Sequence, residues 1–145
     1  MLKLYDGSLE VKTIQNTWFD AVKDKNHGAL SIFIGIVRDE DDIEGLSFDI
    51  YEPILNKWFD TWQEKAKQKD AKIFMAHSRG DVLLHQSSFM CAVSSPKRRV
   101  ALELLDDFVV DFKANAPIWK YDLKDNKRVF IKSRGQKLEN SGVLS

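Results

Sequence analysis

Residues 29–37 read ALSIFIGIV, a near-continuous apolar run rich in β-branched side chains. Such a run predicts a β-strand that is covered on both faces, as is typical of a strand at the centre of a sheet. A helix is expected before it, over residues 8–25, with Ser8 as a plausible N-cap and a turn at residues 26–28. The apolar residues that recur at helical spacing in this segment are Val11, Ile14, Trp18 and Val22.

The next two elements are a second strand and a second helix. An acidic, polar loop over residues 39–45 leads into residues 46–51, which alternate between apolar and polar side chains as a half-buried strand does. Pro53 fits the first turn of a helix. One face of that helix carries the large apolar residues Ile54, Leu55, Trp58, Phe59, Trp62 and Ala66. This stripe predicts core packing.

The rest of the chain predicts four more strands, of which the last two form a hairpin, and a third helix. Residues 72–77 and 87–93 are expected to be strands joined through the turn-prone residues 78–81. A helix over residues 97–113 follows, with Pro117 just beyond its end. Residues 118–123 and 128–132 then predict a β-hairpin that turns at Asp125 and Asn126. We therefore expect a single α+β domain over residues 1–145, in which about three helices pack on a mostly antiparallel sheet.

Composition excludes several classes of function. The 145 residues carry 22 basic and 22 acidic side chains, so no net field draws the protein to nucleic acid or to a membrane. No apolar run is long enough for a membrane-spanning helix, and the N-terminus lacks the apolar core of a signal peptide, so a cytoplasmic protein is expected. Cys91 is the one cysteine, and its neighbours FMCAV favour a buried strand thiol over a catalytic nucleophile.

Three cations stand where the third helix should begin. The segment SSPKRRV at residues 94–100 places Lys97, Arg98 and Arg99 against the helix dipole, which costs about 0.3–1 kcal/mol for each charge. Free backbone N–H groups at the same helix end favour an anion. The cluster therefore indicates either an anion site or three solvated side chains, and the segment alone leaves both interpretations open.

Three further cations are candidates because of their surroundings. Lys113 and Lys120 flank the stiff apolar link ANAPIW, which fixes the direction of both ammonium groups. Taken singly, Lys113 is an ordinary helix C-terminal lysine and Lys120 an ordinary lysine at a strand edge. Arg38 ends an apolar strand at a polar loop, a common position for a functional side chain.

Metal and nucleotide sites are not predicted. No two of His27, His77 and His85 show the spacing of metal ligands, and each is explained by its local structure. The glycines form neither a GxGxxG nor a GxxxxGK[ST] pattern. We expect no metal and no cofactor.

Five blocks of the sequence together resemble the family of large, catalytic subunits of molybdopterin synthase. They are GALSIFIGIVRDE at residues 28–40, LSFDIY at 46–51, HSRGDVLL at 77–84, SSPKRRVALELLDDFVVDFK at 94–113 and APIWKYD at 116–122. The resemblance covers roughly residues 28–123. The chain departs from the family pattern at Lys97, where the family usually has histidine, and at Ser78, His85 and Gln86, which take the places of arginine, glycine and glutamate.

The resemblance implies a hammerhead-like α/β fold and a sulfurtransferase reaction. Members of this family install the dithiolene of molybdopterin on cyclic pyranopterin monophosphate. The sulfur comes from the C-terminal thiocarboxylate of a small ubiquitin-like subunit. The resemblance also implies a central homodimer of large subunits with a small subunit at each end, a heterotetramer.

The same resemblance implies roles for particular residues. Arg38, Lys97 and Arg98 are expected to bind the phosphate and the pterin, with Arg38 reaching in from a second protomer. Lys113 and Lys120 are expected to be catalytic. The substrate-binding set implied in full is Ile36, Val37, Arg38, Lys97, Arg98, Lys113, Lys120, Tyr121 and Asp122.

Two interpretations from other classes compete with this one. A non-catalytic binding module that keeps the fold is suggested by the changes at Lys97 and in HSRGD, although both Lys113 and Lys120 are retained. A small nucleic-acid binder built on residues 97–99 is disfavoured by zero net charge and by aromatic residues that fall on helix core faces.

Overall fold

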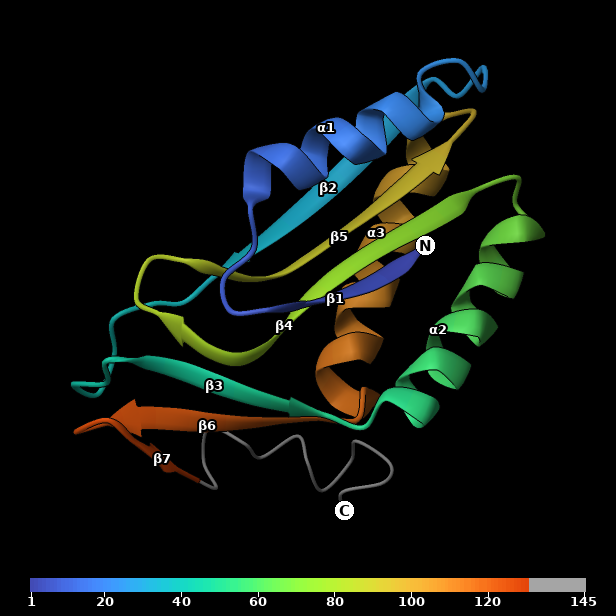
Figure 1. Ribbon diagram of the computed structural model, residues 1–145. Coiled ribbons are helices and arrows are strands. Elements are labelled where there is room, and N and C mark those ends of the chain that lie inside the picture. The colour runs from blue at the N-terminus through green and yellow to red at the C-terminus, as the bar shows by residue number, and fades with distance from the viewer. Residues whose placement is uncertain (131–145) are drawn as a thin grey trace.

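The computed structural model describes residues 1–130 and contains three helices and seven strands in that range. Figure 1 shows one twisted sheet with helices on both faces. The elements in chain order are β1 (Leu2–Asp6), α1 (Val11–Val22), β2 (Ala29–Ile36), β3 (Gly45–Ile50), α2 (Glu52–Lys67), β4 (Lys72–Leu83), β5 (Ser87–Ser95), α3 (Arg98–Asn115), β6 (Ile118–Lys124) and β7 (Lys127–Val129). The predicted α+β class with a mostly antiparallel sheet is confirmed.

The sheet consists of two halves that share the long strand β4. The strand order is β2-β5-β4-β3-β6-β7, and β1 adds to β4 in parallel. The first part of β4 pairs with β5 as far as His77, which lies opposite Phe89. Its last part pairs with β3 from Gly80, which lies opposite Phe48. The change of partner between residues 77 and 80 therefore joins the two halves.

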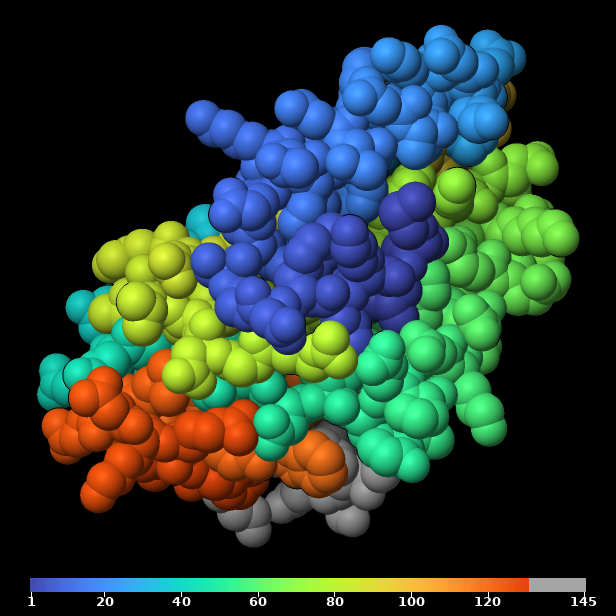
Figure 2. All heavy atoms as spheres, viewed as in Figure 1, coloured from blue at the N-terminus to red at the C-terminus, as the bar shows by residue number. Residues whose placement is uncertain are grey.

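Alternation along the central strands produces a separate core on each face of the sheet. On one face α1 covers Phe74, Ala76, Met90 and Ala92. On the other face α2 and α3 cover Ile73, Met75, Cys91 and Val93. Full burial of one such large side chain contributes roughly 1.5–3 kcal/mol before the entropy loss is subtracted. In Figure 2 the blue atoms of α1 cover the upper part of the visible face, whereas the orange atoms of β6 and β7 form its surface below.

The predicted apolar face of the second helix and the predicted turn of the C-terminal hairpin are confirmed. Pro53 lies in the first turn of α2, and Leu55, Phe59, Trp62 and Ala66 of the predicted stripe are buried. Asp125 and Asn126 have φ of 51° and 60°, so both central residues of the β6–β7 turn are left-handed, as a tight hairpin requires. Residues 131 and 132 of the predicted second strand lie outside the described residues.

The predicted central position of the ALSIFIGIV strand is wrong. Strand β2 lies at an edge of the sheet and pairs only with β5 among the described strands. Its residues are half-buried except Ile36, which is exposed. The apolar pattern arises because α1 packs on one face of β2 and α3 on the other. Coverage of both faces does not reveal whether the strand also has a neighbour at each edge.

The predicted turn at residues 78–81 is also wrong. Strand β4 continues to Leu83, and the turn follows at residues 84–86. Gly80 has φ of +76°, a conformation that only glycine adopts at little cost, and it bends the strand without ending it. The turn-prone composition therefore reflects the point where β4 exchanges β5 for β3.

The predicted N-cap of the first helix is a further error. The helix begins at Val11, two residues after the buried Leu9, and Glu10 takes the N-cap position without a side-chain cap bond. Ser8 therefore caps nothing. No helix among the described residues is long and apolar enough to cross a membrane.

Candidate active site

Lys113 and Lys120 are fixed by the elements on either side of a rigid link. Lys113 lies in the last turn of α3, where its charge is favourable with the dipole, and Lys120 is the third residue of β6. Ala116 and Pro117 between them are buried, and the carbonyl oxygen of Pro117 accepts a hydrogen bond from the Tyr51 N–H at 3.1 Å. The link is thereby held to the start of α2. Burial and this hydrogen bond agree with the stiff link that the sequence predicts.

Both lysines lie close to the buried imidazole of His77. Burial is the main cause that lowers the pKa of His77 from 6.5 to about 4. The hydrogen bond with the Ser78 carbonyl acts in the opposite direction and raises the pKa, whereas the positive charges of Lys113 and Lys120 lower it further. Lys120 is the register partner of Phe48, whose ring packs edge-on against His77 at 4.9 Å. The structure therefore brings Lys113 and Lys120 together at one place, on the face of the sheet that α3 covers.

The two residues after Lys120 lie on opposite faces of β6. Asp122 is buried and shares the face of Lys120. Tyr121 is the register partner of Ser47 and lies on the other face, where the Arg128 guanidinium covers its ring at 4.1 Å. Of these two predicted substrate-binding residues, only Asp122 is thus on the lysine side.

Arg38 follows the end of β2. Val37 is buried in a small cluster with Phe48 and Val82, which places the end of β2 next to the part of the sheet that carries Lys120. Ile36 is exposed, and the Arg38 side chain is 80% exposed with an ion pair to Glu40 at 2.9 Å. Arg38 is therefore available to a ligand.

Lys97 and Arg98 lie at the opposite end of α3 from Lys113. The helix begins at Arg98 and has no acidic residue in its first turn and no side-chain cap, as the three-cation pattern predicts. Lys97, Arg98 and Arg99 line an open hollow together with Gly28, Leu102 and Glu103. Lys113 follows Arg98 by 15 positions, which corresponds to roughly 22 Å of helix. Within one chain these cations and Lys113 cannot contact the same small substrate.

The hollow at the start of α3 depends on a close approach of two backbone segments. The N–H of Gly28 donates to the carbonyl oxygen of Pro96 at 3.1 Å. A Cβ atom at residue 28 would lie 2.6 Å from that oxygen, so only glycine fits there without a shift of the backbone. The start of β2 is thereby held against the start of α3.

The lone cysteine does not contribute a nucleophile. Cys91 is fully buried in β5, and burial raises the pKa of its thiol far above the usual range. The prediction of a buried strand thiol is confirmed. Among residues 1–130, no group of three or more His, Cys, Asp or Glu residues is arranged to hold a metal ion.

Sequence reasoning missed His77 as part of this site. The sequence predicts it at the end of a strand over residues 72–77, but it lies inside β4 and is 2% exposed. The signal that could have found it is a polar residue that directly continues the apolar run IFMA at residues 73–76.

Comparison with known proteins supports the family that the sequence blocks resemble. The profile of the MoaE protein family matches residues 9–115. The chain is 50% identical to the molybdopterin synthase catalytic subunit of Helicobacter pylori, over all of both chains. It is 31% identical to that of Dictyostelium discoideum, over 72% of this chain and 71% of the relative.

Solved structures agree with this result. A chain of the complex of subunits 1 and 2 of the molybdopterin-converting factor from Helicobacter pylori superposes with a TM-score of 0.92 and 49% identity, over 99% of each chain. The molybdopterin synthase structure from Staphylococcus aureus has a TM-score of 0.74 at 20% identity, over 87% of this chain and 93% of that one, and supports the fold alone. The chain therefore belongs to the MoaE family, the family of the molybdopterin synthase catalytic subunits.

Proposed function

We propose that this chain transfers sulfur from the C-terminal thiocarboxylate of a small ubiquitin-like subunit to cyclic pyranopterin monophosphate, and so forms the molybdopterin dithiolene in the cytoplasm. The observation that carries the proposal is the convergence of Lys113 from α3 and Lys120 from β6 beside the ring of His77. A small-subunit partner is supported by the similar chain from Helicobacter pylori, whose structure is a complex of two different subunits.

The charges of the reactants explain why two lysines are required. The thiocarboxylate and the phosphate are both anions, and an ammonium group stabilises negative charge that develops on oxygen during acyl transfer. In the proposed reaction the sulfur forms a bond to a substrate carbon as a carbon–oxygen bond at that carbon breaks, and the displaced oxygen takes the electron pair of the broken bond. Water then cleaves its bond to the carbonyl carbon of the partner, which leaves a carboxylate on the partner. Cys91 is buried and its thiol pKa is raised, which supports the partner as the source of the sulfur.

The separated cations lead to a proposal for a homodimer. Lys97 and Arg98 lie roughly 22 Å along α3 from Lys113, so their predicted role in the same site requires a second copy of the chain. Strand β2 offers the contact, because its eight largely apolar residues pair only with β5 among the described strands. An unpaired apolar edge is a template for a further strand.

An antiparallel contact between two β2 strands would complete the anion site. In a twofold arrangement the end of one β2, followed by Arg38, meets the start of the other, which follows Gly28. Gly28 lines the hollow that contains Lys97 and Arg98. Arg38 of one protomer would then join Lys97 and Arg98 of the other. Val37 at the end of β2 packs against Phe48 of β3, and β3 pairs with the strand that carries Lys120. The three cations would therefore lie beside the Lys113–Lys120 pair of the protomer that supplies Arg38.

The reaction is tested by turnover. The purified chain is supplied with cyclic pyranopterin monophosphate and a thiocarboxylated small subunit, and molybdopterin is measured as its fluorescent oxidation product. We expect product from the parent, loss of product in Lys120→Ala with little change in partner binding, and weaker precursor binding in Arg98→Ala. Lys124→Ala is the matched control, because Lys124 is a lysine of the same strand. Binding of the small subunit without any product would favour a non-catalytic binding module.

The shared site is tested by complementation. Lys120→Ala and Arg98→Ala chains are co-expressed and assayed at a precursor concentration at which neither variant alone forms product. If each site takes Lys120 from one protomer and Arg98 from the other, a mixed dimer has one intact site. Random association then restores about a quarter of the parent activity. Absence of recovery in dimers shown to be mixed would contradict the shared site.

A further inference from the structure

The two lysines are carried by different halves of the sheet. Lys113 ends α3, which packs on β2 and β5 in the first half. Lys120 lies on β6, which pairs with β3 in the second half. The distance between the two ammonium groups therefore depends on the angle at which β4 joins the halves, between residues 77 and 80, as well as on the short link that joins α3 to β6.

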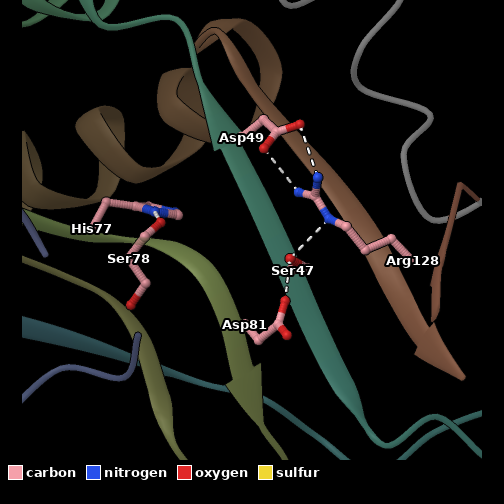
Figure 3. Close-up of polar contacts among 6 residues, drawn as sticks. All are labelled: Ser47, Asp49, His77, Ser78, Asp81 and Arg128. Atoms are coloured by element: carbon pink, nitrogen blue, oxygen red, sulfur yellow. Dashed lines mark hydrogen bonds and ion pairs between the residues drawn. The ribbon is translucent and has the colours of Figure 1, made fainter. Parts of the chain in front are cut away.

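His77 lies at this junction and holds it by a hydrogen bond. Its Nδ1 lies 2.8 Å from the carbonyl oxygen of Ser78, and because a carbonyl only accepts, Nδ1–H is the donor. Figure 3 shows the imidazole of His77 against Ser78 on β4, apart from the Arg128 contacts on the other strands. Ser78 belongs to the segment between the last pair with β5 and the first pair with β3. The bond therefore fixes the ring relative to the bend in the strand.

The ring of His77 also contacts the immediate supports of both lysines. Phe48, the register partner of Lys120, packs edge-on against it at 4.9 Å. Phe112, the residue before Lys113, lies 5.6 Å from it, and Phe112 stacks on Phe89 at 4.0 Å. One side chain thus connects β3, the strand that pairs with the strand of Lys120, with the helix of Lys113.

A phenylalanine would fill this aromatic cage at a lower desolvation cost, so the imidazole indicates a need for its polar atom. His77 is neutral at pH 7, because burial together with the nearby charges of Lys113 and Lys120 lowers its pKa to about 4. It therefore adds no charge to the lysine pair. Its nitrogen serves to orient the ring.

We propose that His77 is a positioning residue for the sulfur-transfer reaction, which sets the spacing of Lys113 and Lys120 by fixing the bend of β4 between the two halves of the sheet. This inference rests on the proposed function, because it takes those two lysines as the catalytic pair. A small error in the position of a catalytic group is sufficient to cost a large factor in rate.

The test compares His77→Phe, which keeps the ring and loses the hydrogen bond, with His77→Gln, which loses the ring. His85→Gln is the control, because His85 lies in the turn after β4. For His77→Phe we expect kcat to fall by about tenfold to a hundredfold, while KM for the precursor and Kd for the small subunit stay within about twofold.

A second readout needs no substrate. A short bifunctional amine-reactive cross-linker should join Lys113 to Lys120 in the parent, as detected by peptide mass spectrometry. The yield of this cross-link should fall in both His77 variants but not in His85→Gln. If His77→Phe does not fold, His77→Gln decides. A folded His77 variant with parental kcat and parental cross-link yield would overturn the proposal. Absence of product from the parent would refute the proposed function, and the cross-link comparison would still test the role of His77.

Discussion

Asp111 joins α3 to α2 through its carboxylate. Its oxygens accept hydrogen bonds from the indole N–H groups of Trp58 at 2.8 Å and Trp62 at 2.7 Å, and from the amide of Asn115 at 2.6 Å. Burial alone would raise the pKa of this carboxyl. The three hydrogen bonds and the charge of Lys65 outweigh burial and hold the pKa below its ordinary value of 3.8. The carboxylate is therefore bound more tightly than the acid.

We expect Asp111→Ala to lower the free energy of unfolding by about 2–4 kcal/mol. A hydrogen bond to a charged group contributes roughly 1.5–3 kcal/mol, but the three bonds share one carboxylate, so their contributions do not simply add. The assay is urea unfolding at pH 7. Asp107→Ala, an exposed carboxylate one turn earlier on α3, is the control and should change stability by no more than about 0.5 kcal/mol.

The pH dependence of the Asp111 contribution has a definite sign. Because the folded-state pKa is lowered, the contribution is fully present above the unfolded value of 3.8 and disappears as the pH falls through the lower folded value. The stability gap between the parent and Asp111→Asn should shrink only in that acidic range. A gap that does not change with pH there, or an Asp111→Ala cost equal to that of Asp107→Ala, would refute this reasoning.

Three further predictions concern stability. The pKa of His77 is about 4 in the folded protein and 6.5 in the unfolded chain, so the free energy of unfolding of the parent should fall by roughly 3 kcal/mol as the pH falls from 6.5 to 4. If the urea midpoint of His77→Phe showed the same pH dependence as that of the parent, this prediction would be wrong. Arg128 donates two bonds to Asp49, at 2.9 and 3.2 Å (Figure 3), so Arg128→Lys should cost about 1 kcal/mol, and a double-mutant cycle with Asp49→Asn should show coupling well above zero. Gly45→Ala would place a Cβ atom against the carbonyl oxygen of Val82, so the free energy of unfolding should fall by about 1–3 kcal/mol. A melting temperature equal to that of the parent would contradict this prediction.

The fold could be predicted from sequence wherever a local pattern is compatible with only one type of element. The apolar stripe of α2, the position of Pro53 and the turn at Asp125 and Asn126 each follow from the geometry of a single element. The edge position of β2 and the path of β4 through Gly80 could not be predicted in this way. They depend on which strands become neighbours, and that information lies elsewhere in the chain.

In the candidate site, too, features that depend on neighbouring residues could be predicted from sequence, whereas features that depend on distant contacts could not. Lys113 and Lys120 could be paired from sequence, because only a short stiff link separates them. The separation of Arg98 from Lys113 follows from the length of α3 and becomes meaningful only when both are assigned to one substrate. The sequence does not point to His77, because its role depends on contacts with residues far away in sequence, such as Phe48 and Phe112.

The sulfur-transfer role of the lysine pair is tested most directly by the fate of the small subunit. The thiocarboxylated partner and cyclic pyranopterin monophosphate are incubated with the parent, Lys120→Ala or Lys124→Ala. The mass of the partner is then followed as sulfur is replaced by oxygen, alongside the fluorescence of oxidised molybdopterin. Because a dithiolene contains two sulfur atoms, we predict that the parent and Lys124→Ala convert two thiocarboxylates to carboxylates for each molybdopterin formed. We predict that Lys120→Ala forms no molybdopterin from the thiocarboxylated partner. Equal conversion and product in Lys120→Ala and the parent would contradict the assignment of this site.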